Sequence, residues 1–235
     1  QKRKLPMKAY QIKIEFLESN PVIWRRIVMP AGATFYRLHQ TIQTVTNFMS
    51  YYEPYHFFEI ELSEENMIIT DNDEVYQEHQ NYKNNKRLFD EQLKEIEPEF
   101  ESFFRAQVER LNKVVRKPST IKIDQYIEKY GEFLYHYDFG DGWKLLVTLE
   151  KVVDDHYYGY PILIDGEENA PPEDVGGMSG YYQFLEAYYN PSHPEHHSYR
   201  QWANPSHYRE YDKDRINESL KFFKYKKTEW DKIND

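Results

Sequence analysis

The sequence contains no cysteine, which removes several classes of function at once. Disulfide bonds, thiolate nucleophiles and zinc or iron–sulfur sites built on cysteine are excluded. The apolar runs are only a handful of residues long, far short of a bilayer span. The basic start, QKRKLPMKAY, is not followed by the apolar region of a signal peptide. We therefore expect a cytoplasmic protein without a membrane segment.

Positive charge is in the minority, with 30 Lys and Arg against 40 Asp and Glu and a net charge of −10. Non-specific binding to nucleic acid is not expected, because it depends on neutralising phosphates. Arg25–Arg26 and Lys224–Lys227 are short basic runs, and a solvated face is the favoured interpretation of both. A protein or nucleic-acid partner of unknown identity stays open.

Familiar catalytic motifs are also missing. The sequence has no phosphate-binding glycine loop that ends in Lys-Ser/Thr, no Gly-x-Ser-x-Gly and no His-Glu-x-x-His. Aromatic residues, in contrast, are abundant, with 22 tyrosines and 14 phenylalanines. Such rings suggest an aromatic core that extends to the surface.

The first third of the chain reads as β-β-α-β. Alternating apolar residues predict strands at 10–16 and 22–29, which we expect to pair as a hairpin. Apolar residues at steps of three and four predict a helix over 34–49, with Thr34 as its N-cap. A third strand is predicted over 56–62, with His56 on its apolar face.

The segment 73–117 is charged and helical in period, and its apolar stripe is expected to pack on the sheet. Strands over 133–139 and 143–153 follow, and Asp141-Gly142 between them predicts a two-residue hairpin turn. A long Gly/Pro/acid-rich loop is expected over 160–180. Helices carrying Tyr181–Tyr188 and Ile216–Phe223 complete the chain.

These elements predict one α+β domain over 5–235 with a helical insertion at about 73–117. Its mixed, largely antiparallel sheet would have about five strands, with the 34–49 helix on one face. The β-β-α-β start is loosely β-grasp-like. The C-terminal helices would cover other surfaces.

Histidines and acidic residues are the main candidates for chemistry. Asp138, Asp141, Glu173 and Asp174, with His56, could meet at one end of the sheet. Clustered carboxylates of this kind can bind a divalent cation and assist hydrolysis. For His56 alone, a buried and hydrogen-bonded core histidine is the favoured interpretation. A metal site at His193, His196 and His197 is disfavoured, because their Pro, Ser and Glu surroundings are typical of a solvated turn.

A structural role explains the same acids and is favoured. Asp138 and Asp141 would satisfy backbone donors in the turn, as Asp does in Asx-turns. Glu173-Asp174 would cap a short helical turn or pair with Arg25 or Arg26, since Arg binds carboxylates bidentately. That pairing would attach the long loop to the first hairpin.

An ordered set of motifs runs through the chain, namely Pro21-x-Ile23-Trp24-Arg25-Arg26, Leu38-His39, Ile42-Gln43, His56, Tyr135-x-Tyr137-Asp138-Phe139-Gly140-Asp141-x-Trp143, Tyr160-Pro161, Pro171-Pro172-Glu173-Asp174-x-Gly176-Gly177 and Gly180-Tyr181. Together they resemble one family, the plasmid pRiA open-reading-frame-three-like proteins, also described as insertion-element passenger (TnpR-like) proteins. The resemblance runs from about Tyr10 to Leu220, with 73–117 its least similar part, and implies a compact α+β domain often found on mobile elements.

This chain departs from the family's pattern at four positions. Many members have cysteines around the Pro-Pro-Glu-Asp loop, where this chain has Leu163, Ala170 and Val175, and a histidine where it has Leu145. A metal or thiol function that depends on those groups in relatives is not available here.

The leading hypothesis is a non-enzymatic binding or accessory module of mobile-element biology, with no assigned cofactor or metal. Its ligand would lie in an aromatic and acidic groove. One alternative is a metal-dependent hydrolase or nuclease that uses the carboxylates and a divalent cation, and another is an interaction scaffold built on 73–117. The candidate binding surface comprises Arg25, Arg26, His56, Tyr135, Asp138, Asp141, Trp143, Glu173 and Asp174.

Overall fold

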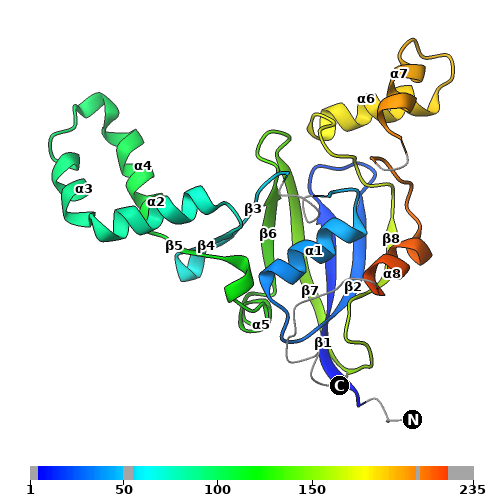
Figure 1. Ribbon diagram of the computed structural model, residues 1–235, viewed down its shortest axis with the longest axis horizontal. Coiled ribbons are helices and arrows are strands. Elements are labelled where there is room, and N and C mark those ends of the chain that lie inside the picture. The colour runs from blue at the N-terminus through cyan, green and yellow to red at the C-terminus, as the bar shows by residue number, and fades with distance from the viewer. Residues whose placement is uncertain (1–4, 50–54, 205–206, 222–235) are drawn as a thin grey trace.

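The computed structural model describes residues 5–49, 55–204 and 207–221. Its strands form one mixed sheet of eight, in the order β5-β4-β3-β6-β7-β1-β2-β8 (Figure 1). All neighbouring strands are antiparallel except β4 and β5. The strands are β1 (Met7–Phe16), β2 (Trp24–Pro30), β3 (Phe58–Leu62), β4 (Met67–Thr70), β5 (Val114–Arg116), β6 (Glu132–Tyr137), β7 (Trp143–His156) and β8 (Ile162–Glu167).

The predicted β-β-α-β start is confirmed. Strands β1 and β2 pair as an antiparallel hairpin, and α1 (Phe35–Val45) follows them. The hydroxyl of Thr34 accepts a hydrogen bond from the backbone N–H of Arg37, as an N-cap does. The apolar residues of α1 are fully buried, because the helix lies across one face of the sheet (Figure 1).

The remaining helices cover edges and ends of the sheet (Figure 1). Helix α8 packs against α1 and β8, and α5 packs against β6 and β7. The predicted C-terminal helix is α8, although Phe223 lies outside the described residues. These helices are α5 (Asp124–Tyr130), α6 (Gly177–Tyr189), α7 (His196–Trp202) and α8 (Lys213–Lys221).

The prediction of about five strands is wrong, because it missed β4, β5 and β8. Strands β4 and β5 have four and three residues, too few to show a period of two. Strand β8 lies inside the stretch that was expected to be a loop, where its Asp and Gly suggest a turn. Its pairing with β2 is a tertiary contact that local sequence does not reveal. The β-grasp detail has no support in this strand order.

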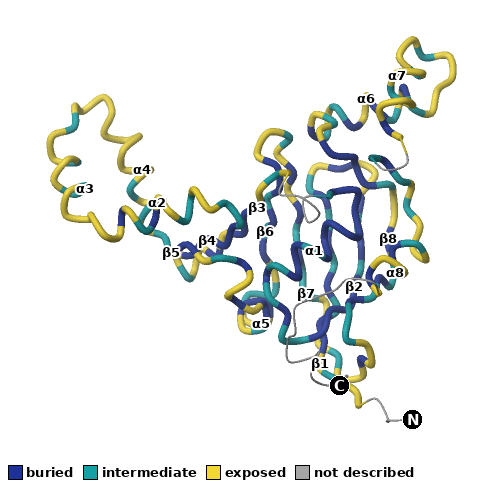
Figure 2. The backbone as a smooth tube through the Cα atoms, viewed as in Figure 1, coloured by how far each residue is buried: buried dark blue, intermediate teal, exposed yellow. Residues whose placement is uncertain are grey.

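The helical insertion, residues 73–117, does not pack on the sheet as predicted. It extends away from the sheet and is exposed over most of its length (Figure 2). No residue of α3 or α4 is buried, and Phe103 is 62% exposed. Contact with the remainder of the protein is made through its base, where β5 pairs with β4. The helices are α2 (Asp73–Asn84), α3 (Lys86–Leu93) and α4 (Glu101–Asn112).

The predicted hairpin of β6 and β7 is present, but its turn is longer than the Asp141-Gly142 prediction. Tyr137 pairs with Trp143, so five residues, 138–142, connect the strands. The left-handed conformations belong to Asp138, with φ 52°, and Gly142, with φ 72°. Asp138 tolerates this conformation because its side chain accepts from the N–H of Gly140 within the turn.

Candidate functional site

His56 lies two residues before β3 rather than on its apolar face. Its side chain is 23% exposed, so the expected buried core histidine is wrong. The backbone there is tied to the β6–β7 turn, since Asp138 N–H donates to the carbonyl of Phe57 and Phe58 pairs with Tyr137. Pairing of β3 with β6 therefore brings His56 and Asp138 together from positions far apart in the chain.

Asp138 is almost fully buried at the start of the turn. Its Oδ1 accepts from the N–H of Gly140 at 3.0 Å and from that of Asp141 at 3.3 Å. The same oxygen lies 3.5 Å from Nδ1 of His56. The expected turn-stabilising role of Asp138 is therefore present, and its carboxylate also faces the histidine.

Glu173 reaches the same place from the loop between β8 and α6, and its side chain is buried. Its Oε1 accepts from the hydroxyl of Tyr137 at 2.6 Å and from the N–H of Met49 at 2.7 Å. Nε2 of His207 lies 3.0 Å from the Glu173 carbonyl oxygen, which fixes the backbone. Burial raises the pKa of Glu173, while the Tyr137 and Met49 hydrogen bonds partly oppose that effect.

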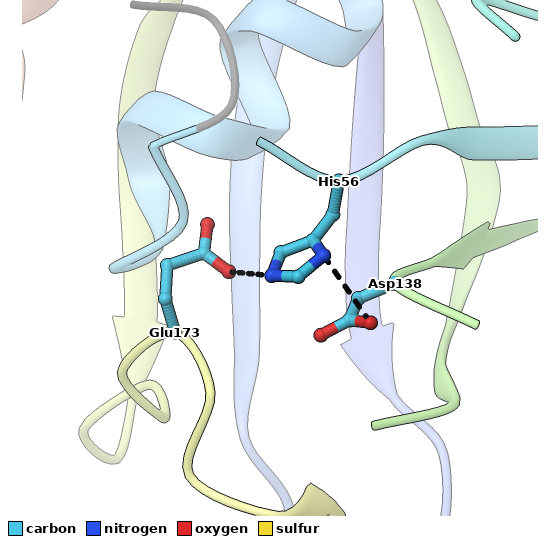
Figure 3. A group of neighbouring side chains, drawn as sticks. All are labelled: His56, Asp138 and Glu173. Atoms are coloured by element: carbon cyan, nitrogen blue, oxygen red, sulfur yellow. Dashed lines mark ion pairs between the residues drawn. The ribbon is translucent and has the colours of Figure 1, made fainter. Parts of the chain in front are cut away.

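We call His56, Asp138, Glu173 and Asp174 the His56 cluster. Figure 3 shows the His56 ring between the carboxylates of Glu173 and Asp138. Nε2 of His56 lies 4.0 Å from Oε2 of Glu173 and 3.0 Å from Oδ1 of Asp174. Within the described residues, no Lys or Arg forms an ion pair with any of these carboxylates. The cluster therefore concentrates negative charge, and among the described residues His56 is the one cationic partner within ion-pair distance of it.

Asp174 forms the solvent-facing side of the cluster. Its side chain is 43% exposed and accepts from the hydroxyl of Tyr55 at 2.7 Å. A surface cavity of about 270 Å³ borders Asp174 and is lined on its other side by residues at and near α7. This cavity opens the exposed end of the cluster to a small ligand. Its lining residues are Asp174, Val175, Glu195, Ser198, Tyr199 and Trp202.

Asp141 joins the two loops of the site and does not face His56. Its Oδ2 accepts from the N–H of Gly176 at 3.0 Å, and its backbone oxygen closely approaches Gly177. A Cβ at position 177 would lie 2.7 Å from that oxygen, and φ there is 67°. The close contact and the positive φ both require glycine at position 177. The Pro-Pro-Glu-Asp loop is thereby docked on the β6–β7 turn.

The expected pairing of Arg25 or Arg26 with Glu173-Asp174 is wrong. Arg25 is buried and donates to the carbonyl oxygens of Glu167 and Glu168, at 2.8 and 2.9 Å. Arg26 forms a bidentate pair with Glu150 on β7. Hydrogen bonds from Arg25 to backbone carbonyls, and not an ion pair with Glu173 or Asp174, attach the loop to the first hairpin. Among the described residues, no arginine pairs with the acids of the cluster.

The aromatic members of the predicted groove are core residues. Tyr135 is fully buried, and its hydroxyl contacts Nδ1 of His39 at 2.8 Å. Burial lowers the pKa of His39 to about 3, so this histidine is neutral. Trp143 is 3% exposed and packs edge-on against Phe16. Neither ring offers a binding surface, so the groove reduces to the His56 cluster and its rim.

Sequence reasoning missed the residues that hold the carboxylates. Tyr137 alternates inward with Tyr135, which indicates burial but not that its hydroxyl reaches a loop 36 residues later. Tyr55 and the Met49 amide carry no motif of their own. Their roles depend on the tertiary placement of the Pro-Pro-Glu-Asp loop.

The histidines at and just before α7 form hydrogen bonds with nearby backbone groups. His196 Nδ1 bonds the Ala187 carbonyl at 2.8 Å, and His193 Nδ1 accepts from the Glu195 N–H at 3.1 Å. Among the described residues, one group of side chains could together hold a metal ion, namely His56, Asp138 and Glu173.

No described helix combines the length and the apolar character that crossing a bilayer requires.

Comparison with known proteins identifies the relatives of this fold and site. The family model described as plasmid pRiA4b ORF-3-like protein matches residues 8–219. This chain belongs to the plasmid pRiA4b ORF-3-like family. The match contains all four members of the His56 cluster and the helical insertion.

Two relatives of the plasmid pRiA4b ORF-3-like chain are informative. An uncharacterized protein, y4hQ of Sinorhizobium fredii, is 40% identical over 76 residues, 32% of this chain and 39% of that protein. The matched segment thus spans well under two thirds of y4hQ. The crystal structure of MM3350 from Methanosarcina mazei Go1, a protein of unknown function, matches with a TM-score of 0.60 at 28% identity. That match covers 88% of this chain and 97% of MM3350.

Proposed function

We propose that this protein is a non-enzymatic binding module of mobile-element biology and that it takes its ligand at the His56 cluster. The observation that carries the proposal is the convergence of Asp138, Glu173 and Asp174 without an arginine or lysine partner among the described residues. Buried carboxylates are normally paired, and those that are not favour a cationic ligand. The name of the family supports the plasmid context.

The ligand that fits this cluster is a small cation or the cationic end of a larger molecule. Glu173 and Asp138 provide buried acceptors, while exposed Asp174 and the adjacent cavity provide access. Burial strengthens charge–charge attraction, since the local dielectric constant is lower than that of water. A ligand with a single positive centre would therefore gain most at the inner end of the cluster.

Calorimetric titration tests this proposal with three probes, namely MnCl₂, spermidine and an arginine-containing tripeptide. At least one probe should bind the wild type, and Glu173→Gln should lower its affinity at least tenfold. Glu59→Gln is the matched control, because Glu59 is a buried carboxylate that Arg110 already neutralises. Failure of all three probes to bind would refute the proposal.

A metal-dependent hydrolase or nuclease is the second candidate. It is favoured by the His56 imidazole beside two carboxylates, groups that serve as metal ligands and as general bases. The test measures cleavage of bis-p-nitrophenyl phosphate and of single-stranded DNA with MnCl₂ present. Turnover that Glu173→Gln abolishes and Glu59→Gln preserves would replace the binding module with an enzyme.

An interaction scaffold on the helical insertion is the third candidate, supported by exposed Phe100 and Phe103. Sedimentation velocity of the wild type and of Phe100→Ser/Phe103→Ser tests it. Self-association that disappears in the double variant supports the scaffold, and a monomeric wild type removes self-association as its mode of action.

A further inference from the structure

We propose that the His56 cluster is a divalent-cation site in which His56, Asp138 and Glu173 each supply one ligand. This inference rests on the proposed binding function and names its ligand class. A transition-metal ion such as Zn²⁺ or Mn²⁺ fits the donor set of one imidazole nitrogen and two carboxylate oxygens.

The donor atoms lie slightly farther apart than they would around a bound ion, so small side-chain movements would bring them into place. One ligand atom from each of the three residues lies within 4.8 Å of the other two. Donors bonded to one ion at about 2.1 Å lie roughly 3.0–4.2 Å apart, depending on the geometry. An ion binds only one of the two ring nitrogens of His56; Nδ1 lies 3.5 Å from Oδ1 of Asp138, and Nε2 lies 4.0 Å from Oε2 of Glu173. One of the two carboxylates would therefore shift toward the nitrogen that holds the ion.

Glu173 provides an independent observation in favour of a ligand. Its Oε2 is buried and has no hydrogen-bond partner among the described residues. The other oxygen is held by Tyr137 and by the amide of Met49, so the carboxylate is fixed in place. A buried oxygen without a partner loses its hydration and recovers nothing in return. In Figure 3 this carboxylate faces His56, where an ion would satisfy the oxygen.

Hydrogen bonds that orient the ligand carboxylates are already present, as they are in metal sites. Tyr137 orients Glu173, and the N–H groups of Gly140 and Asp141 orient Asp138. Asp174 is exposed and 3.0 Å from Nε2 of His56, so it can turn toward solvent when an ion enters. Three protein ligands beside a solvent-facing side leave room for water in the remaining positions.

The nature of the ligands selects among ions. Calcium prefers six to eight oxygen ligands, and magnesium keeps most of its water, so an imidazole disfavours both. Zn²⁺ and Mn²⁺ accept mixed nitrogen and oxygen ligands. We expect CaCl₂ and MgCl₂ to bind at least tenfold more weakly than ZnCl₂.

Calorimetry with ZnCl₂ and MnCl₂, on chelator-treated protein without a polyhistidine tag, is the main test. Wild type should bind one ion per chain. His56→Gln, Asp138→Asn and Glu173→Gln should each lower the affinity at least tenfold. Asn is chosen at 138 because it tolerates the left-handed backbone and can still accept in the turn.

Matched controls separate this site from adventitious binding. His79→Gln removes a histidine whose Nδ1 bonds the Leu111 carbonyl, and Glu59→Gln removes a paired buried acid, so both should retain wild-type affinity. His193→Ala/His197→Ala should also retain it. Loss of binding in this double variant, or full binding in all three cluster variants, would overturn the proposal.

Two-dimensional NMR of the histidine rings gives a second readout. Added ZnCl₂ should shift the ring nitrogen signals of His56 and leave those of His79 unchanged. If spermidine or the arginine tripeptide binds and depends on Glu173 while neither metal binds, the binding module stands and the metal site fails. If no probe binds, both fail together.

Discussion

Arg25 on β2 and Glu173 on the loop between β8 and α6 are two buried charges, and their surroundings are opposite. The Arg25 guanidinium donates to the carbonyl oxygens of Val45, Trp24, Glu167 and Glu168 and lies 4.3 Å from the Tyr211 ring. Oε1 of Glu173 accepts two hydrogen bonds, whereas Oε2 has no hydrogen-bond partner among the described residues. A buried charge with every group satisfied belongs to the scaffold, whereas one with an open oxygen is suited to a ligand.

Burial itself affects both groups in the same direction, toward the neutral form. It lowers the pKa of Arg25 to about 10, which leaves the guanidinium charged at neutral pH, and it raises the pKa of Glu173. The difference between them is therefore one of hydrogen bonding. Carbonyl dipoles surround Arg25, and a histidine and a second carboxylate surround Glu173.

The largest loss of stability is expected from substitution of Arg25. Arg25→Met should lower the free energy of unfolding by about 3 kcal/mol, because it leaves several buried carbonyls without donors. Urea unfolding followed by circular dichroism measures the change. A loss below about 1 kcal/mol would contradict the scaffold role and place Arg25 with the ligand-binding groups.

A third charge, the half-buried Asp71, extends the comparison to pH. Burial raises its pKa from 3.8 to about 6, although Oδ1 accepts from the Phe58 N–H. The stability that its protonated form contributes is full below pH 3.8 and is lost as the pH rises through about 6. Relative to wild type, Asp71→Asn should therefore gain stability, on the order of 1–2 kcal/mol, between pH 4 and pH 7.

Urea titrations of both proteins at pH 4, 5, 6 and 7 measure this difference. Asn retains the acceptor for Phe58, so the variant isolates the charge. Parallel stability curves would show that Asp71 ionises without cost in the folded protein.

Tyr137→Phe removes the hydroxyl that holds Glu173 at 2.6 Å. We expect a loss of about 1 kcal/mol in unfolding free energy. Metal affinity should fall about tenfold, because no hydroxyl then orients the Glu173 carboxylate toward the ion. Tyr135→Phe is the control, since its hydroxyl contacts His39 and Gln43 instead. Equal metal affinity in wild type and Tyr137→Phe would show that Glu173 needs no positioning.

The smallest loss of stability is expected from substitution of Arg26, the neighbour of Arg25 in sequence. Its bidentate pair with Glu150 is partly exposed, and such pairs contribute little. Arg26→Met should cost about 0.5 kcal/mol in the same urea assay. A cost equal to that of Arg25→Met would mean that burial does not distinguish the two arginines.

Local sequence patterns determined much of the scaffold. The hairpin of β1 and β2, the Thr34-capped helix and the β6–β7 pair follow from alternation, three-and-four spacing and capping chemistry within short windows. The family motifs likewise pointed to Asp138, Glu173 and Asp174 as a group. The hairpin, the capped helix and the strand pair depend on neighbours in the chain, so sequence alone was enough to predict them.

Only the tertiary structure decided which charges meet. Arg25 and Arg26 are adjacent in sequence, but β-strand geometry points them to opposite faces, one into the core and one to Glu150. The helical insertion has an amphipathic period, yet it extends from the sheet edge and leaves Phe103 exposed. His56 meets Glu173 because β3 pairs with β6 and the Pro-Pro-Glu-Asp loop docks on the turn between β6 and β7. Such long-range contacts depend on the whole fold, which no local pattern encodes.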